Sequence, residues 1–121
     1  MNCNSDTVNI PYRLGRLFSV LEEIQSAANP NINATIKDKY FNSASATPAI
    51  VFPILGNLAQ KHLRKLPVGQ RIYLEKKMTE IMEPLGEEYP TRLNLQQQGS
   101  FQLGYYHQTQ LRYTAKNKEE E

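Results

Sequence analysis

Residues 36–53, IKDKYFNSASATPAIVFP, contain the signals for two helices and for the connection between them. The stretch predicts a short helix that carries Lys37 and Lys39, a break of small residues at 43–46, and a new helix that begins at Thr47 and Pro48. Threonine is a preferred N-cap residue, and proline suits the first turn because the N–H that it lacks would have no partner there. The chain is therefore expected to fold as helices joined by short connections.

Upstream of this stretch, the sequence predicts one long amphipathic helix. Asn9 and Pro11 begin it, and Asn29 and Pro30 end it. Apolar residues recur at helical spacing between these signals and form one stripe, made of Leu14, Leu17, Phe18, Leu21, Ile24 and Ala28.

Further helices are expected at residues 32–45, capped by Asn31, at 47–66 and at 70–85. The one at 47–66 is apolar around most of its circumference, so we expect it at the centre of the fold. Asn94 and Gln97 resemble a capping box and begin a last helix that is expected to end near Tyr113. The prediction is an all-α fold: an antiparallel bundle of about five helices in a single domain at residues 11–113. A flexible stretch at 1–10 and a charged, disordered tail at 114–121 are expected on either side of it.

The charge of the 121-residue chain is unevenly distributed. Residues 1–71 hold eight basic and four acidic side chains, net +4, whereas residues 72–121 hold six basic and eight acidic ones, net −2. A basic half suits contact with a polyanion, although ordinary solvated helix faces would give the same count. Cys3 is the only cysteine, which excludes a disulfide framework. With no long apolar run and no signal-peptide pattern in residues 1–10, the sequence predicts a cytoplasmic protein.

Eight basic residues are candidates for binding nucleic acid: Arg13, Arg16, Lys37, Lys39, Lys61, Arg64, Lys65 and Arg71. Arg13 lies in a first helical turn, where the helix dipole disfavours a cation. It would therefore serve either an external anion or a salt bridge to an acid such as Asp38. Lys37 and Lys39 are predicted to project to nearly opposite sides of their helix. Lys76 and Lys77 are expected to be neutralised by Glu80 and Glu83 on the same helix.

The last predicted helix carries no formal charge from residue 93 to residue 111, and this span holds six glutamines. Depletion of charge together with tyrosine is typical of protein interfaces. The candidate interface residues are Gln98, Gln102, Tyr105, Tyr106 and Gln110. The alternative is packing within the bundle, which we expect for Leu103 and for part of the tyrosine pair.

The sequence offers no support for catalysis. His62 lies on an apolar helix face and is interpreted as a core histidine with its hydrogen bonds satisfied, and His107 stands alone among polar residues. No carboxylate lies at metal-ligand spacing from either, and no phosphate loop, nucleophile elbow or zinc motif is present. We therefore expect a protein that is not an enzyme and that needs no cofactor and no metal.

Three segments together resemble a known family. Residues 12–18 (YRLGRLF), 36–53 and 103–110 (LGYYHQTQ) follow the order of the C-terminal region of the type I-C CRISPR large subunit. In that family the region is also made separately, from an internal start, as the small subunit of the RNA-guided DNA surveillance complex Cascade. The resemblance implies that Met1 is such a start and that residues 2–9 are remnant linker. Arg13, Arg16, Lys37 and Lys39 lie inside the matching segments. The basic residues at 61–71 lie outside them, so only their charge makes them candidates for binding nucleic acid.

The resemblance also implies the partners. They are the Cascade backbone and large subunits, additional copies of this chain, the target DNA and the displaced non-target strand, with guide RNA reached indirectly and no membrane. Base pairing reads sequence in such complexes, while protein stabilises the nucleic-acid backbones. The alternative is a purely structural scaffold that bridges subunits without touching nucleic acid. An enzyme is a distant third hypothesis.

Overall fold

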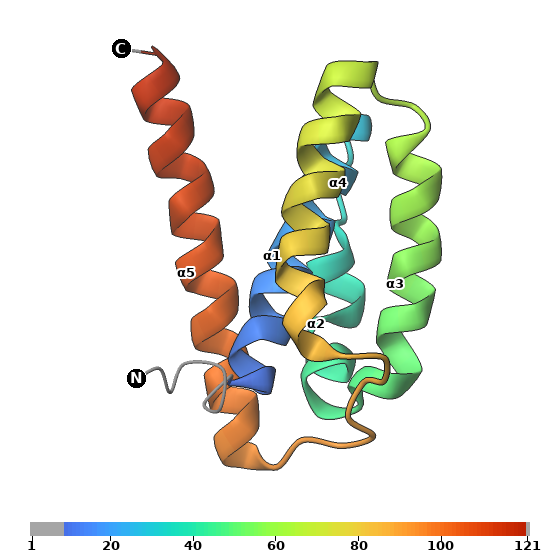
Figure 1. Ribbon diagram of the computed structural model, residues 1–121, viewed down its shortest axis with the longest axis vertical. Coiled ribbons are helices and arrows are strands. Elements are labelled where there is room, and N and C mark those ends of the chain that lie inside the picture. The colour runs from blue at the N-terminus through green and yellow to red at the C-terminus, as the bar shows by residue number, and fades with distance from the viewer. Residues whose placement is uncertain (1–8, 121) are drawn as a thin grey trace.

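The computed structural model describes residues 9–120, which form five α-helices, one short 3₁₀ helix and the loops that join them (Figure 1). The helices are α1 (Ile10–Ala28), α2 (Ile36–Ala46), α3 (Pro48–Leu63), α4 (Val68–Met82), η1 (Glu83–Leu85) and α5 (Leu95–Glu120). Successive α-helices run in alternating directions, and the described residues contain no strand. The predicted all-α bundle is confirmed. Of the expected flexible stretch at residues 1–10, residues 1–8, which include Cys3, lie outside the described part, whereas Asn9 caps α1 and Ile10 begins it.

α1 is the central helix, because it packs against each of the other four α-helices. Asn9 caps it as predicted, since its side chain accepts a hydrogen bond from the backbone N–H of Tyr12 at 3.1 Å. The predicted apolar stripe is buried from Leu14 to Ile24. The expectation that the third helix is central is wrong. α3 packs mainly on α1 and α2, and Ile50 and Ile54 on its far side are 64% and 43% exposed.

The first and last helices form the largest interface of the bundle and run in the same direction. Two glycines make their close contact possible. A Cβ atom on Gly15 of α1 would overlap with the carbonyl oxygen of Phe101 in α5. A Cβ atom on Gly104 of α5 would overlap with the carbonyl oxygen of Tyr12 in α1. Only glycine lets the two backbones approach so closely.

The core is built around Phe18 of α1. Its ring meets Phe41 of α2, Phe52 of α3, and Phe101 and Tyr105 of α5 edge-on, with centroid distances of 5.4–6.5 Å. Edge-to-face packing places the positive edge of one ring on the negative face of another. One aromatic cluster therefore ties four helices together.

α2 begins later than predicted. Its N-cap is Thr35 and not Asn31: the Thr35 hydroxyl accepts from the backbone N–H of Lys37 at 3.2 Å, and Asp38 accepts from the Thr35 N–H at 3.0 Å. This reciprocal pair satisfies N–H groups that have no partner within the helix. At the next boundary Thr47 is the N-cap of α3, as predicted, but its hydroxyl donates to the Ser43 carbonyl.

The connection from α4 to α5 is held by backbone hydrogen bonds to the α2–α3 corner. The N–H of Leu93 donates to Ala46 and the N–H of Ala49 donates to Pro90, both at 2.9 Å. The predicted capping box then begins α5, because Asn94 and Gln97 each accept from the backbone N–H of the other at 2.8 Å. The prediction that this helix ends near Tyr113 is wrong, since α5 continues to Glu120.

Candidate nucleic-acid interface

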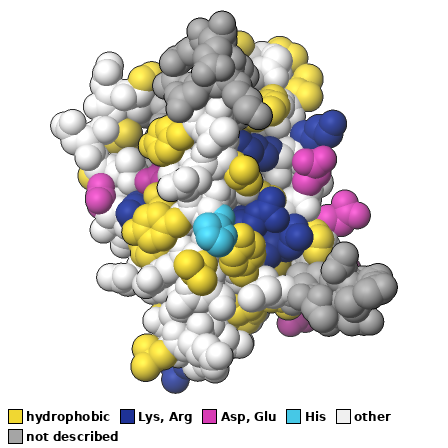
Figure 2. Space-filling view, turned by 90° about the vertical axis from the view of Figure 1, so that its left-hand side faces the viewer, with side chains coloured by type: hydrophobic (Ala, Val, Ile, Leu, Met, Phe, Trp, Pro, Cys, Tyr) yellow, Lys and Arg dark blue, Asp and Glu magenta, His cyan; other side chains and the backbone are white. Residues whose placement is uncertain are grey.

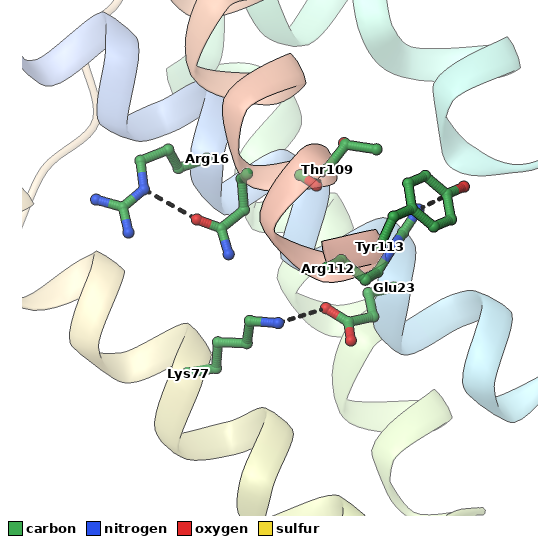
Figure 3. A network of polar contacts seen from close by, with 8 residues as sticks. Arg16, Glu23, Lys77, Thr109, Arg112 and Tyr113 are labelled. Atoms are coloured by element: carbon green, nitrogen blue, oxygen red, sulfur yellow. Dashed lines mark hydrogen bonds and ion pairs between the residues drawn. The ribbon is translucent and has the colours of Figure 1, made fainter. Parts of the chain in front are cut away.

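A basic pocket of about 430 Å³ lies between α1, α4 and α5. α1 contributes Arg13 and Arg16, and α4 contributes Tyr73, Lys76, Lys77 and Glu80. Figure 3 shows Arg16 and the Lys77–Glu23 pair in the space between these helices. The volume falls within the range of about 300–1,000 Å³ that is typical of small-ligand sites. The pocket wall holds four cationic side chains and one carboxylate, so its net positive charge favours binding of an anion.

The two arginines are held by neutral groups. Arg13 donates from its guanidinium to the carbonyl of Ile81 at 3.4 Å, and the Nε of Arg16 donates to the side-chain oxygen of Gln108 at 3.0 Å. Burial, and after it the positive charge of Arg16, lower the pKa of Arg13 below its ordinary value. Among the described residues neither arginine makes an ion pair. The sequence left two roles open for Arg13, an external anion or a salt bridge to an acid such as Asp38. The salt bridge to Asp38 is excluded, because the Asp38 carboxylate caps α2.

Lys77 has a different partner from the one that the sequence predicted. Its ammonium group lies 2.9 Å from the carboxylate of Glu23 in α1, the one ion pair within the described residues. Lys76 lines the pocket beside the arginines, so the expected neutralisation of both lysines by Glu80 and Glu83 is wrong. Lys76 is thus a candidate that the sequence analysis missed. Helical periodicity places Tyr73, Lys76, Lys77 and Glu80 on one face, but it does not say which helix that face meets.

The remaining basic candidates are not part of this pocket. Lys61 lies in the last turn of α3, Arg64 and Lys65 directly follow it, and Arg71 lies in the first turns of α4. Arg71 precedes Ile81 by ten residues, so at about 1.5 Å per residue it lies roughly 15 Å along α4 from the carbonyl that Arg13 contacts. These residues form a second basic region at the α3–α4 end of the bundle.

Lys37 is engaged by aromatic rings. Its ammonium lies 5.6 Å from the ring centroid of Phe41, 5.1 Å from that of Tyr105 and 5.3 Å from that of Tyr106. Such cation–π contacts fix the cation within the chain. Lys39 is exposed and lies 5.6 Å from the ring of its neighbour Tyr40. The geometry therefore does not bring either lysine to the basic pocket.

His62 is half-buried between α1 and α3. Its Nδ1 accepts from the side-chain amide of Asn29 at 3.2 Å, whereas its buried Nε2 has no hydrogen-bond partner among the described residues. Burial, followed by the charge of Lys65, lowers the pKa of His62, so it is neutral at pH 7. The prediction of a core histidine with its hydrogen bonds satisfied is therefore wrong, because His62 is only half-buried and its Nε2 lacks a partner. His107 is exposed and its Nδ1 lies 2.6 Å from the Tyr12 hydroxyl.

The outward side of α5 is an uncharged surface. Gln102, Tyr106 and Gln110, three of the five interface candidates, are exposed on it, whereas Gln98 is half-buried and donates to the Leu93 carbonyl at 3.0 Å. Tyr105 is 4% exposed, so it belongs to the core. Leu103 is 56% exposed, and its expected packing within the bundle is wrong. Figure 2 shows this side of the molecule, where hydrophobic side chains lie among uncharged polar ones and a group of basic side chains lies beside the histidine near the centre of the view.

The described residues contain neither a cluster of metal ligands nor a membrane-spanning helix. No group of three or more His, Cys, Asp or Glu side chains there is arranged to hold a metal ion. None of the helices in residues 9–120 combines the length and the apolar composition that crossing a bilayer requires.

Fold and surface together define a small all-helical protein with a basic pocket and an uncharged helix face. The family of the CRISPR-associated protein Cas_Csd1 matches residues 1–113 of the chain. The chain therefore belongs to this CRISPR-associated family, which confirms the family resemblance of the three sequence segments. A search of curated proteins found no match.

Proposed function

We propose that this chain is a non-catalytic small subunit of a type I-C CRISPR RNA-guided surveillance complex. It stabilises DNA strands through sequence-independent contacts to their backbones and bridges other subunits. The observation that carries the proposal is the basic pocket, where Arg13, Arg16 and Lys76 line one cavity and none of them has an ion-pair partner among the described residues. Neutralising a phosphate releases condensed counterions, a contribution to affinity that does not depend on base sequence.

The same proposal assigns the uncharged face of α5 to protein partners. Leu103, Tyr106 and Leu111 are each at least half exposed there. Interface cores are depleted in charge and enriched in tyrosine relative to the remaining surface. This face favours subunit contacts, and it also supports the second candidate function, a scaffold that bridges proteins without touching DNA.

Charge removal at the pocket tests the proposal. In the assembled complex, Arg13→Gln with Arg16→Gln should weaken binding of every DNA sequence alike. It should also reduce the slope of log affinity against log salt by about 1.4–1.8, at roughly 0.7–0.9 for each phosphate that is no longer neutralised. Arg64→Gln with Lys65→Gln removes the same charge from the other basic region, and the pocket predicts a smaller effect there. Normal assembly with unchanged DNA affinity and salt slope in the Arg13/Arg16 variant would overturn the DNA contact and favour the scaffold.

A further inference from the structure

Tyr73 stands in the wall of the basic pocket with much of its ring accessible. The side chain is 56% exposed, although it lies on a helix that packs against α1. The ammonium of Lys77 lies 5.4 Å from the centroid of this ring and also bonds to Glu23 on α1 at 2.9 Å. The tyrosine is thus held at the pocket by a lysine whose own position is fixed by a second helix.

The cations beside Tyr73 differ in what they can offer a ligand. Lys77 is committed to Glu23, and the Nε of Arg16 to Gln108. The terminal nitrogens of the Arg16 guanidinium and the ammonium of Lys76 have no partner among the described residues. Glu80 in the same wall repels a densely charged anion more than a singly charged one. The pocket therefore suits a phosphodiester, which carries one negative charge.

We propose that the pocket and Tyr73 form a binding site for one nucleotide of single-stranded DNA. Arg13, Arg16 and Lys76 hold the phosphate, and an adjacent unpaired base stacks on the Tyr73 ring. Gln108 is a positioning residue, because it fixes the Nε side of Arg16. This inference rests on the proposed function and adds to it a preference for unpaired strands.

The preference follows from where bases lie. In a duplex they are stacked inside the helix and cannot reach a protein ring, so only the phosphate contacts remain. An unpaired base can stack on an aromatic side chain, which contributes about five- to 150-fold in affinity per base. The stacking contribution should therefore appear with single strands alone.

The test is fluorescence anisotropy of the full chain at low salt, with labelled oligothymidylate and with a duplex of equal length. The wild type should bind the single strand more tightly than the duplex. Tyr73→Leu should weaken single-strand binding by about five- to 150-fold and leave duplex binding unchanged, whereas Tyr73→Phe keeps the ring and should resemble the wild type. Lys76→Gln should weaken binding of both.

The chain offers a matched control in Tyr113 of α5. It is also 56% exposed and also has a cation near its ring, Arg112 at 5.1 Å, but it does not line the pocket. Tyr113→Leu should leave both affinities unchanged. The single-strand site would be overturned if Tyr73→Leu and Tyr113→Leu weakened binding equally. It would also be overturned if Tyr73→Leu left the affinity for both DNA forms unchanged. Either result would leave the proposed DNA contact intact. Absence of binding to the single strand would also overturn the single-strand site, and the proposed DNA contact would still be decided by the Arg13/Arg16 variant in the assembled complex.

Discussion

Gly15 and Gly104 are reciprocal partners across the α1–α5 interface, since each faces backbone of the helix that carries the other. At either position an added Cβ would overlap with a carbonyl oxygen, which cannot rotate away as the end of a flexible side chain could. The two glycines thus set the separation of the central helix from the last one. Because α5 also supplies Phe101 and Tyr105 to the aromatic cluster, this separation controls packing in the core.

Replacing Gly104 by alanine should therefore destabilise the fold, although alanine is the better helix former. Forcing an extra methyl group into a tight contact costs about 1–3 kcal/mol. Gly99 of the same helix is the matched control, because a Cβ there meets no atom within 4 Å. Gly99→Ala should stabilise the protein by up to about 1 kcal/mol. Urea unfolding with unchanged m-values measures both, and similar shifts of the two midpoints would contradict the close crossing.

The carboxylate of Glu22 is buried and depends on hydroxyl donors. Glu22 is 7% exposed, and it accepts from Tyr105 and, at 3.0 Å, from Thr35. Tyr105→Phe should cost about 1.5–3 kcal/mol, because it removes a donor from a buried charged acceptor. Tyr106→Phe removes a hydroxyl from the adjacent residue, which is 50% exposed, and should be nearly neutral. The comparison is made by chemical unfolding at pH 7, where equal effects would argue against the buried contact.

The same pair predicts a pH dependence at alkaline pH. Burial, followed by the hydrogen bond to Glu22 and its charge, raises the pKa of Tyr105 above its ordinary value of 10.0. The unfolded chain therefore loses this proton at lower pH than the folded chain does. The resulting stabilisation is complete below about pH 10 and is lost as pH rises toward the folded-state pKa. Above pH 10 the stability difference between wild type and Tyr105→Phe should shrink, whereas a constant difference would contradict the raised pKa.

The start of α2 gives a third comparison. Thr35 accepts from the Lys37 N–H and donates to Glu22, so its hydroxyl serves both the cap and the buried carboxylate. Thr35→Ala should destabilise the protein by about 1–2 kcal/mol, in the upper range for loss of a cap. Asn31 is exposed and lies outside the helix, and Asn31→Ala should change stability by less than about 0.5 kcal/mol. Thermal unfolding of the Thr35→Ala and Asn31→Ala variants measures the difference. A larger destabilisation by Asn31→Ala would indicate that α2 begins at Asn31.

The sequence predicted the parts of the fold that depend on neighbouring residues. The caps at Asn9 and at Asn94 with Gln97 were correct, because each involves groups three residues apart. The predicted start of α2 was wrong because two residues that can cap a helix, Asn31 and Thr35, lie only four positions apart, and the sequence pattern fits either one. The Asp38 carboxylate, which completes the pair with Thr35, decides between them.

Features made by residues distant in the sequence were the ones missed. The apolar circumference of α3 predicted a central helix, but Ile50 and Ile54 are exposed. Apolar composition therefore did not predict which side of the helix is buried. The pocket joins α1 to a face of α4, and the ion pair of Lys77 with Glu23 depends on how these helices pack. Periodicity identifies the faces of a helix but not their partners, which is why Lys76 was assigned to a neutralised surface.

The exposed face of α5 gives the last prediction, through Leu103. This side chain is 56% exposed, so Leu103→Lys should change the stability of the free chain by less than about 0.5 kcal/mol. If α5 contacts other subunits as proposed, the buried and unpaired lysine should strongly reduce incorporation into the complex. Ile50→Lys on α3 is the control, because Ile50 is 64% exposed and lies away from α5. Native mass spectrometry of complexes assembled with each variant measures how much of the chain is incorporated.

Normal incorporation of the Leu103→Lys variant would exclude this part of α5 from the interface. A reduction seen with Leu103→Lys but not with Ile50→Lys would show that α5 makes the contact, and not exposed apolar surface in general.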